Sequence, residues 1–96
     1  MNAVTDRVSL IRDSLTALHP VHLEIIDESH KHIGHAGARQ GGGHFRVNIV
    51  SDMFTGKGLL ERHRMVYACL QDAMQSEIHA LSIKAYTPEE LNSNEG

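Results

Sequence analysis

The chain has 96 residues, a formal net charge of −3, eight histidines, one cysteine and no tryptophan. A chain of this length folds as one domain with a small core, so we expect no elaborate enclosed active site. The lone cysteine excludes an internal disulfide, and the sequence contains neither a recognisable signal peptide nor a membrane-spanning apolar run, which predicts a cytoplasmic protein without a membrane partner.

The first half of the chain reads as a helix, a strand and a loop. Apolar side chains from Val4 to Leu18 recur at spacings of three and four residues, which predicts a helix that Pro20 ends. Residues 21–29 then have the pattern of a strand. Residues 30–43 are rich in glycine and predict a flexible loop between this strand and the next.

The second half opens with a strand and continues with a longer helix. Residues 44–49 alternate polar and apolar side chains, as expected of a strand with one buried face. Gly56 and Gly58 mark a turn, and residues 59–74 carry a strong helical apolar stripe.

A third strand and a short helix complete the predicted fold. The strand begins at His79 and continues through Ala85, and Thr87 then caps a helix that Pro88 opens. The first two strands are expected to pair antiparallel, and the long helix to cross over to a third strand parallel to a neighbour. We therefore expect an α+β fold, in which helices cover one face of a small mixed three-stranded sheet. The single domain spans residues 1–96, with a core over about 4–91 and a flexible tail at 92–96.

The middle of the sequence is basic. Residues 31–64 contain six basic and two acidic side chains, a local charge of about +4 between two acidic segments. Arg62 and Arg64 flank His63, which lies on the apolar stripe, and together with Lys57 they can present charge to a partner. Arginine suits a carboxylate or a phosphate because it donates two parallel hydrogen bonds. An ordinary solvated face is the alternative interpretation.

The sequence contains no arrangement typical of an enzyme. It has no Ser-His-Asp pattern, phosphate-binding loop or paired-carboxylate motif. Cys69 lies inside the second predicted helix beside its apolar stripe, where a cysteine packs as a small hydrophobic residue. We therefore expect a non-enzymatic protein.

His79 is the residue on which a functional interpretation depends. It shares the apolar parity of the third predicted strand, so it is either a core histidine bonded to a backbone carbonyl or a metal ligand. A metal site needs a second ligand, which the loop can supply if it folds towards the start of that strand. Because one or two histidines cannot enclose a metal, a partner would have to complete the coordination shell. Four histidines lie in or beside the loop, namely His30, His32, His35 and His44.

The chain resembles the BolA family over roughly residues 4–91, in the runs DESHKH, HFRV, FTGKGLLERHRMVYACL and IHALSIKAYTPEE. This resemblance implies a fold similar to the class II KH domain. It also implies that the protein binds a monothiol glutaredoxin of the CGFS type and shares a [2Fe-2S] cluster with it. His79, which opens the HAL motif, would be one ligand, and His32, three residues after Ser29, the second. A glutaredoxin cysteine and a glutathione would complete the four ligands.

The loop departs from the family pattern in ways that keep alternatives open. Its additional histidines leave His35 and His44 as alternative second ligands, and a zinc site without a partner is a further alternative. The loop has no cysteine, which excludes the cysteine type of the family. In isolation the chain is expected to hold no cluster, and a weak homodimer is one possible state.

DNA is the alternative partner that the resemblance implies. The family includes bacterial members that resemble transcription regulators affecting cell shape and stress responses. The turn at residues 55–58 lacks the GXXG motif with which KH domains bind nucleic acid. Contacts with DNA would therefore depend on Lys57, Arg62 and Arg64.

Overall fold

The computed structural model describes residues 7–29, 43–76 and 78–95 as an alternation of helices and strands. The elements in chain order are α1 (Arg7–Leu15), the 3-10 turn η1 (Thr16–Leu18), β1 (His22–Asp27), β2 (Gly43–Val50), the 3-10 turn η4 (Asp52–Phe54), α2 (Leu59–Cys69), α3 (Gln71–Ser76), β3 (Ile78–Tyr86) and α4 (Pro88–Glu95). The predicted α+β class is confirmed.

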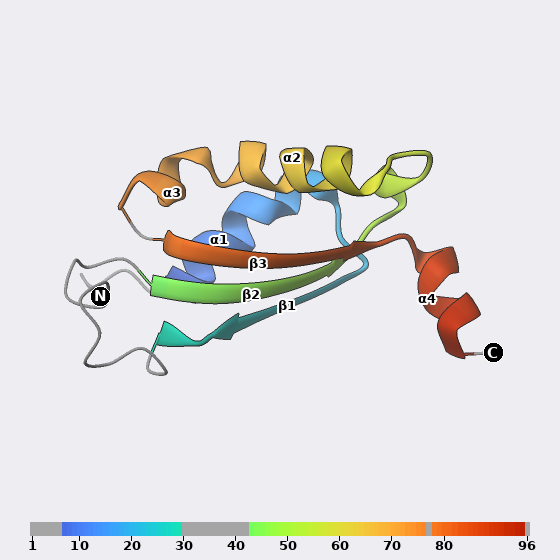
Figure 1. The fold of residues 1–96 in the computed structure, drawn as a ribbon, viewed down its shortest axis with the longest axis horizontal. Coiled ribbons are helices and arrows are strands. Elements are labelled where there is room, and N and C mark those ends of the chain that lie inside the picture. Colours follow the sequence, from blue (N-terminus) through green and yellow to red (C-terminus); the bar gives the residue numbers. More distant parts are fainter. Residues whose placement is uncertain (1–6, 30–42, 77, 96) are drawn as a thin grey trace.

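The three strands form one mixed sheet in the order β1-β2-β3. β1 pairs antiparallel with β2, and β3 pairs parallel with β2, as the sequence predicted. Figure 1 shows α1, α2 and α3 on one side of this sheet, whereas α4 follows the end of β3. In the part of the chain that the structure describes, α4 borders the opposite face of the sheet at one end, and no other helix lies on that face.

The core lies between the sheet and the helices. In β2 the side chains of Phe45, Val47 and Ile49 are at most 2% exposed, whereas those of Arg46 and Asn48 are half-buried on the open face. This alternation follows from the period of two along a strand. The buried hydrophobic residues that pack together are Ile11, Leu15, Leu18, Phe45, Val47, Ile49, Phe54, Val66, Leu70, Ala73, Ile78, Ile83 and Ala85.

The first helix ends as the sequence predicted. It passes into the 3-10 turn, after which His19 adopts a left-handed conformation with φ of 46°. The His19 backbone N–H donates to the Thr16 carbonyl at 2.9 Å, which satisfies one of the carbonyls at the helix end. Pro20 follows and cannot continue the hydrogen-bonding pattern, so the chain turns into β1.

The long helix predicted for residues 59–74 is divided into α2 and α3. The break lies at Leu70, which has φ of −102° and ψ of 13° and is fully buried. Its backbone N–H donates to both the Val66 carbonyl at 3.2 Å and the Tyr67 carbonyl at 3.1 Å, so this turn is tighter than a regular α-helix. No glycine or proline marks the position, and the apolar stripe continues through it, so the sequence pattern predicted a single helix.

The terminal helix α4 starts with the cap that the sequence predicted. The Glu90 backbone N–H donates to Thr87 Oγ1 at 3.2 Å, and the Thr87 backbone N–H donates to Glu90 Oε1 at 3.0 Å, which is a capping box. The helix then continues to Glu95. The flexible tail expected at residues 92–96 stays a prediction. Within the described ranges, no helix combines the length and the apolar character needed to span a membrane.

Candidate metal-ligand site

An extra residue in β3 turns His79 out of the core. Gly43 pairs with Ile78 and His44 pairs with Ala80, so His79 is the residue of β3 with no partner in β2. Such a bulge shifts the alternation of buried and exposed side chains by one residue. Ile78 is therefore buried and His79 exposed, and the prediction that His79 shares the apolar parity of the strand was wrong.

The bulge brings His79 next to His44. His44 is half-buried on the open face of β2, and its ring centroid lies 5.3 Å from that of His79, with 41° between the ring planes. Two imidazoles that bind one tetrahedral ion through metal–nitrogen bonds of about 2.0–2.1 Å have their ring centres roughly 5 Å apart. The spacing of this pair therefore suits two ligands of a single metal ion.

Hydrogen bonds at the end of β1 hold the backbone of His44. Ser29 Oγ accepts from the His44 backbone N–H at 2.9 Å, and the Glu28 backbone N–H donates to the His44 carbonyl at 2.8 Å. The Asp27 carboxylate in turn accepts from the Ser29 backbone N–H at 2.9 Å. These contacts fix the position of His44 at the point where the chain re-enters the sheet.

Gly43 allows this close approach of the strands. A Cβ at Gly43 would lie 2.6 Å from the Phe45 ring and 2.7 Å from Ser29 Oγ, both closer than atoms of side chains approach one another. Because Phe45 is buried, its ring cannot move aside without disturbing the core. The sequence analysis gave Ser29 and Gly43 no structural role at this site, although a glycine within a strand often marks a bulge or a close approach of backbones.

The histidine pair lies beside a small groove of about 160 Å³, lined in part by Glu28, Ala80 and Ser82. The Glu28 carboxylate also lies 3.3 Å from the Arg46 guanidinium. Residues 7–29, 43–76 and 78–95 contain no group of three or more histidine, cysteine, aspartate or glutamate side chains that could hold a metal ion. His44 and His79 thus offer at most two ligands, and other ligands would have to come from elsewhere.

The predicted ligand His32 lies outside the described residues, as do His30 and His35. Of the loop histidines considered from the sequence, His44 is therefore the one whose position relative to His79 is known.

Arg62 is bound within the chain, contrary to the expectation that it presents its charge to a partner. Its side chain is only 12% exposed. Nη1 and Nη2 donate to the two carboxylate oxygens of Glu90 at 2.7 and 2.8 Å, while Nη1 also donates to the Ala85 carbonyl at 3.1 Å. Nε donates to the Lys57 carbonyl at 2.8 Å, and the guanidinium lies over the Phe54 ring, 5.9 Å from its centroid. Arg62 therefore connects the start of α2 with β3 and α4.

This network changes the ionisation of both partners. The side-chain hydrogen bonds from Arg62, followed by the bond from the Thr87 backbone N–H, lower the pKa of Glu90 to about 2. The hydrogen bonds to Glu90 likewise raise the pKa of Arg62. Both changes favour the charged forms, as expected for a bidentate arginine–carboxylate pair.

Lys57 and Arg64 remain as cations near the surface of this region. The Lys57 side chain is 40% exposed and its amino group lies 3.6 Å from the Glu61 carboxylate, one helical turn further on. Arg64 is exposed on α2 beside Leu60, which is 65% exposed. His63 is half-buried, and its Nε2 atom has no hydrogen-bond partner among the described residues.

Comparison with known proteins gives one family and several close relatives. The sequence model of the family described as BolA-like protein matches residues 15–90. SufE-like protein 1 of Arabidopsis thaliana is 47% identical over 95 residues, which covers 93% of this chain but only 26% of that protein. The chain thus spans about a quarter of the length of this relative. The DNA-binding transcriptional regulator BolA of Escherichia coli is 45% identical over 74 residues, covering 77% of this chain and 68% of the relative.

A solved structure resembles the whole arrangement. The BolA domain of SufE1 from Arabidopsis thaliana aligns with a TM-score of 0.77 and 47% identity, covering 92% of this chain and 99% of that chain.

Proposed function

Because the chain belongs to the BolA-like family, we propose that it is a non-enzymatic partner of a monothiol CGFS glutaredoxin, with which it co-ligates a [2Fe-2S] cluster. The observation that carries the proposal is the pair formed by His44 and His79, whose ring centroids are 5.3 Å apart at one end of the sheet. The described part of the chain offers no third ligand there, so a cluster would need ligands from a partner. The isolated protein is accordingly proposed to hold no cluster.

The chemistry of the donors fits such a cluster. Imidazole nitrogens replace cysteine thiolates on one iron of some two-iron clusters, so a mixture of histidine and thiolate ligands is chemically sound. His79 is the proposed first ligand. The proposed second ligand is His44 or one of the loop residues His32 and His35, and a glutaredoxin cysteine and a glutathione thiolate supply the rest. When bound, the cluster provides a redox-active iron centre that the two proteins can transfer or sense.

Cys69 supports a non-enzymatic role and a reducing, cytoplasmic setting. It is the single cysteine of the sequence, and it is half-buried against the core. Burial raises the pKa of its thiol, which disfavours the reactive thiolate.

The test is the visible absorption and circular dichroism of the protein mixed with a cluster-loaded CGFS glutaredoxin. The wild-type mixture should give a spectrum different from that of the glutaredoxin homodimer. His79→Ala should abolish or alter that spectrum, because it removes a ligand. His19→Asn is the matched control, because His19 is exposed, lies outside the pair and has a left-handed backbone that asparagine tolerates. An unchanged spectrum in His79→Ala would refute the ligand assignment.

Single replacements identify the second ligand. His44→Ala, His32→Ala and His35→Ala are each mixed with the same cluster-loaded glutaredoxin. If the visible spectrum changes with only one of these variants, the residue replaced in that variant is the second ligand. A sizing column run without the cluster separates binding of the glutaredoxin from ligation. A protein that neither changes the spectrum nor forms a complex on the column would contradict the whole proposal.

A second candidate function is DNA binding in a regulator that affects cell morphology and stress response. It is favoured by the 45% identity to the Escherichia coli DNA-binding transcriptional regulator. Lys57 and Arg64 are the cations of the basic segment that would contact phosphates, since Arg62 is already bound to Glu90. Replacing Lys57 and Arg64 with glutamine should weaken DNA binding and flatten its salt dependence. Equal binding of promoter and random duplexes at physiological salt would exclude specific regulation.

A further inference from the structure

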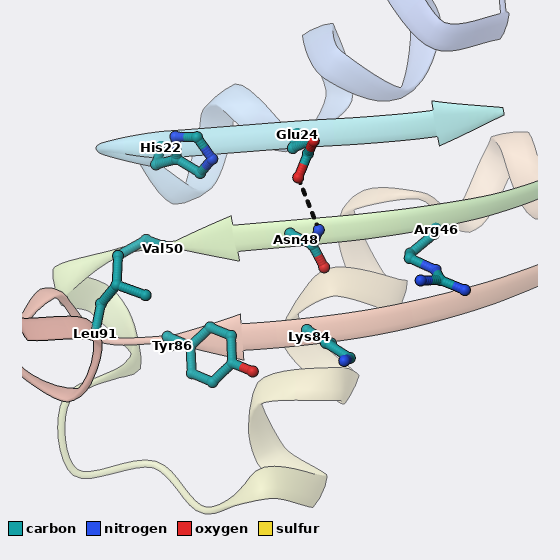
Figure 2. Close-up of a pocket in the computed structure, with 8 residues that line it drawn as sticks. All are labelled: His22, Glu24, Arg46, Asn48, Val50, Lys84, Tyr86 and Leu91. Atoms are coloured by element: carbon teal, nitrogen blue, oxygen red, sulfur yellow. Dashed lines mark hydrogen bonds between the residues drawn. The ribbon is translucent and has the colours of Figure 1, made fainter. Parts of the chain in front are cut away.

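The face of the sheet opposite α1, α2 and α3 carries a groove of about 410 Å³ (Figure 2). It is bounded by all three strands and, at one end, by Leu91 of α4. Most of its lining comes from two rows of residues that are neighbours across the sheet, namely Glu24, Asn48 and Lys84 in one row and His22, Val50 and Tyr86 in the other.

One end of this open-face groove is cationic. Figure 2 shows Arg46 and Lys84 on neighbouring strands at this end. The one carboxylate in the lining, that of Glu24, accepts a hydrogen bond of 2.9 Å from Asn48 Nδ2 and is thereby held on the β1 side of the groove. Lys84 is exposed, and its amino group has no ion-pair or hydrogen-bond partner among the residues that the structure describes. An anion at this end would therefore meet an uncompensated lysine.

The other end of the groove is apolar. Figure 2 places Val50 and Leu91 there, with the Tyr86 ring between them and the lysine. Leu91 lines the groove and is 38% exposed, so its side chain offers apolar surface to a ligand. Because side chains two residues apart on one strand are separated by about 7 Å, a ligand that contacts both Lys84 and Tyr86 needs a body of about that length.

We propose that the open-face groove binds a small monoanion, a carboxylate joined to an aromatic ring or a short acyl chain. The carboxylate lies at Lys84 and Arg46, and the apolar body lies over Tyr86, Val50 and Leu91. The Arg46 guanidinium lies 3.3 Å from the Glu28 carboxylate, and the Glu24 carboxylate is bonded to Asn48. Among the described residues Lys84 is therefore the cation of the lining without a carboxylate partner, and one negative charge on the ligand matches it. A second negative charge would face Glu24.

This site is separate from the histidine pair. The groove lining includes neither His44 nor His79. Its lining residue nearest to the pair along β2 is Arg46, two residues from His44, which corresponds to about 7 Å along a strand. The groove therefore forms without the histidine pair and exists in the protein without its partner, although at this distance a bound carboxylate and a charge at the pair would still influence one another at physiological salt.

The experiment is a titration of the full chain with 2-naphthoate, followed by amide proton and nitrogen chemical shifts. A ligand of about a dozen non-hydrogen atoms in an open groove is expected to bind with a dissociation constant on the order of 1 mM. Saturable shifts are expected at Asn48, Lys84 and Tyr86, and they should be larger than any at His79. The neutral analogue 2-naphthalenemethanol should bind more weakly, because it cannot use the lysine.

Two variants test the two halves of the site. Lys84→Gln should weaken 2-naphthoate binding roughly fivefold and remove most of the difference from the alcohol, since a partly exposed ion pair contributes modestly. Leu91→Ala should weaken the acid and the alcohol alike. Arg12→Gln on α1 is the control, because Arg12 is exposed and its helix lies on the other side of the sheet. The spectrum of each variant without ligand verifies that it is folded.

Three results would overturn the proposal. The first is the absence of saturable shifts up to about 10 mM ligand, well above the expected dissociation constant. The second is equal affinity of wild type and Lys84→Gln for the acid. The third is that the chemical shifts of the groove residues change with protein concentration in the absence of ligand. Such changes would mean that a second copy of the chain occupies this face.

Discussion

The two ends of the sheet use polar side chains in opposite ways. At the end near α4, Arg62 makes hydrogen bonds to Glu90, Lys57 and Ala85, so its charge is compensated inside the chain. At the other end, backbone contacts hold His44 beside His79, and the ligands that could enclose a metal are missing from the described residues. The first arrangement stabilises the fold, whereas the second is the proposed point of contact with a partner. A charged residue whose partners lie within its own chain, as those of Arg62 do, contributes to the fold and is not evidence of a binding surface.

Of the variants that test this comparison, Gly43→Val is expected to lower the free energy of unfolding the most. Its side chain would meet the Phe45 ring and Ser29 Oγ, since even a Cβ lies 2.6 and 2.7 Å from them. Overpacking of this kind costs about 3 kcal/mol in the free energy of unfolding, measured by urea denaturation. Gly58→Ser is the control, because a Cβ there meets nothing within 4 Å and serine is a better helix cap than glycine. Equal stability of the two variants would contradict the close approach at Gly43.

Arg62→Met tests the opposite end. Methionine keeps apolar contact with Phe54 but removes the hydrogen bonds that satisfy the Ala85 and Lys57 carbonyls. Loss of charge-assisted bonds at a largely buried side chain should lower the free energy of unfolding by about 2 kcal/mol. Arg64→Met on the same helix, at an exposed position, should change it by less than about 0.5 kcal/mol. Similar losses in both variants would mean that the Arg62 network contributes little.

Ser29→Ala should have a smaller effect that is concentrated at the histidine pair. It removes the acceptor of the His44 backbone N–H, a bond of 2.9 Å that is only partly buried. The expected loss is about 1 kcal/mol in the free energy of unfolding. The ring proton shifts of His44 and His79 should change more than those of His19, which lies away from the pair. Unchanged shifts at the pair would show that Ser29 does not hold His44.

The smallest expected effect is the pH dependence that Glu90 contributes. Its folded pKa, lowered to about 2 by Arg62, is below the value near 4.3 of an unfolded glutamate. As the pH falls, the Glu90 carboxylate takes up a proton in the unfolded state before it does so in the folded state. Its contribution to the free energy of unfolding is therefore complete above about pH 5 and disappears towards pH 2. Glu90→Gln should accordingly be less stable than wild type at pH 7 and approach it below pH 3. A constant difference across this range would contradict the lowered pKa.

The sequence determined the order of elements and much of the core. The period of two in residues 44–49 predicted the buried face of β2, and Thr87 and Pro88 predicted the start of α4, because these signals depend on neighbours along the chain. The family resemblance was confirmed, and it also directed attention to His79. The break at Leu70 escaped prediction because the apolar stripe continues through it.

The tertiary structure decided which polar residues are available to a partner. The exposure of His79 depends on one extra residue in the pairing of β2 with β3. The residue pattern of β3 alone does not reveal in which register it pairs with β2. His44 becomes its neighbour for the same reason. Arg62 resembled Arg64 in sequence, but the packing of α2 against β3 and α4 brings it to Glu90, 28 positions away. Local periodicity sets which side of an element is apolar, whereas contacts between distant elements determine which polar groups remain for chemistry.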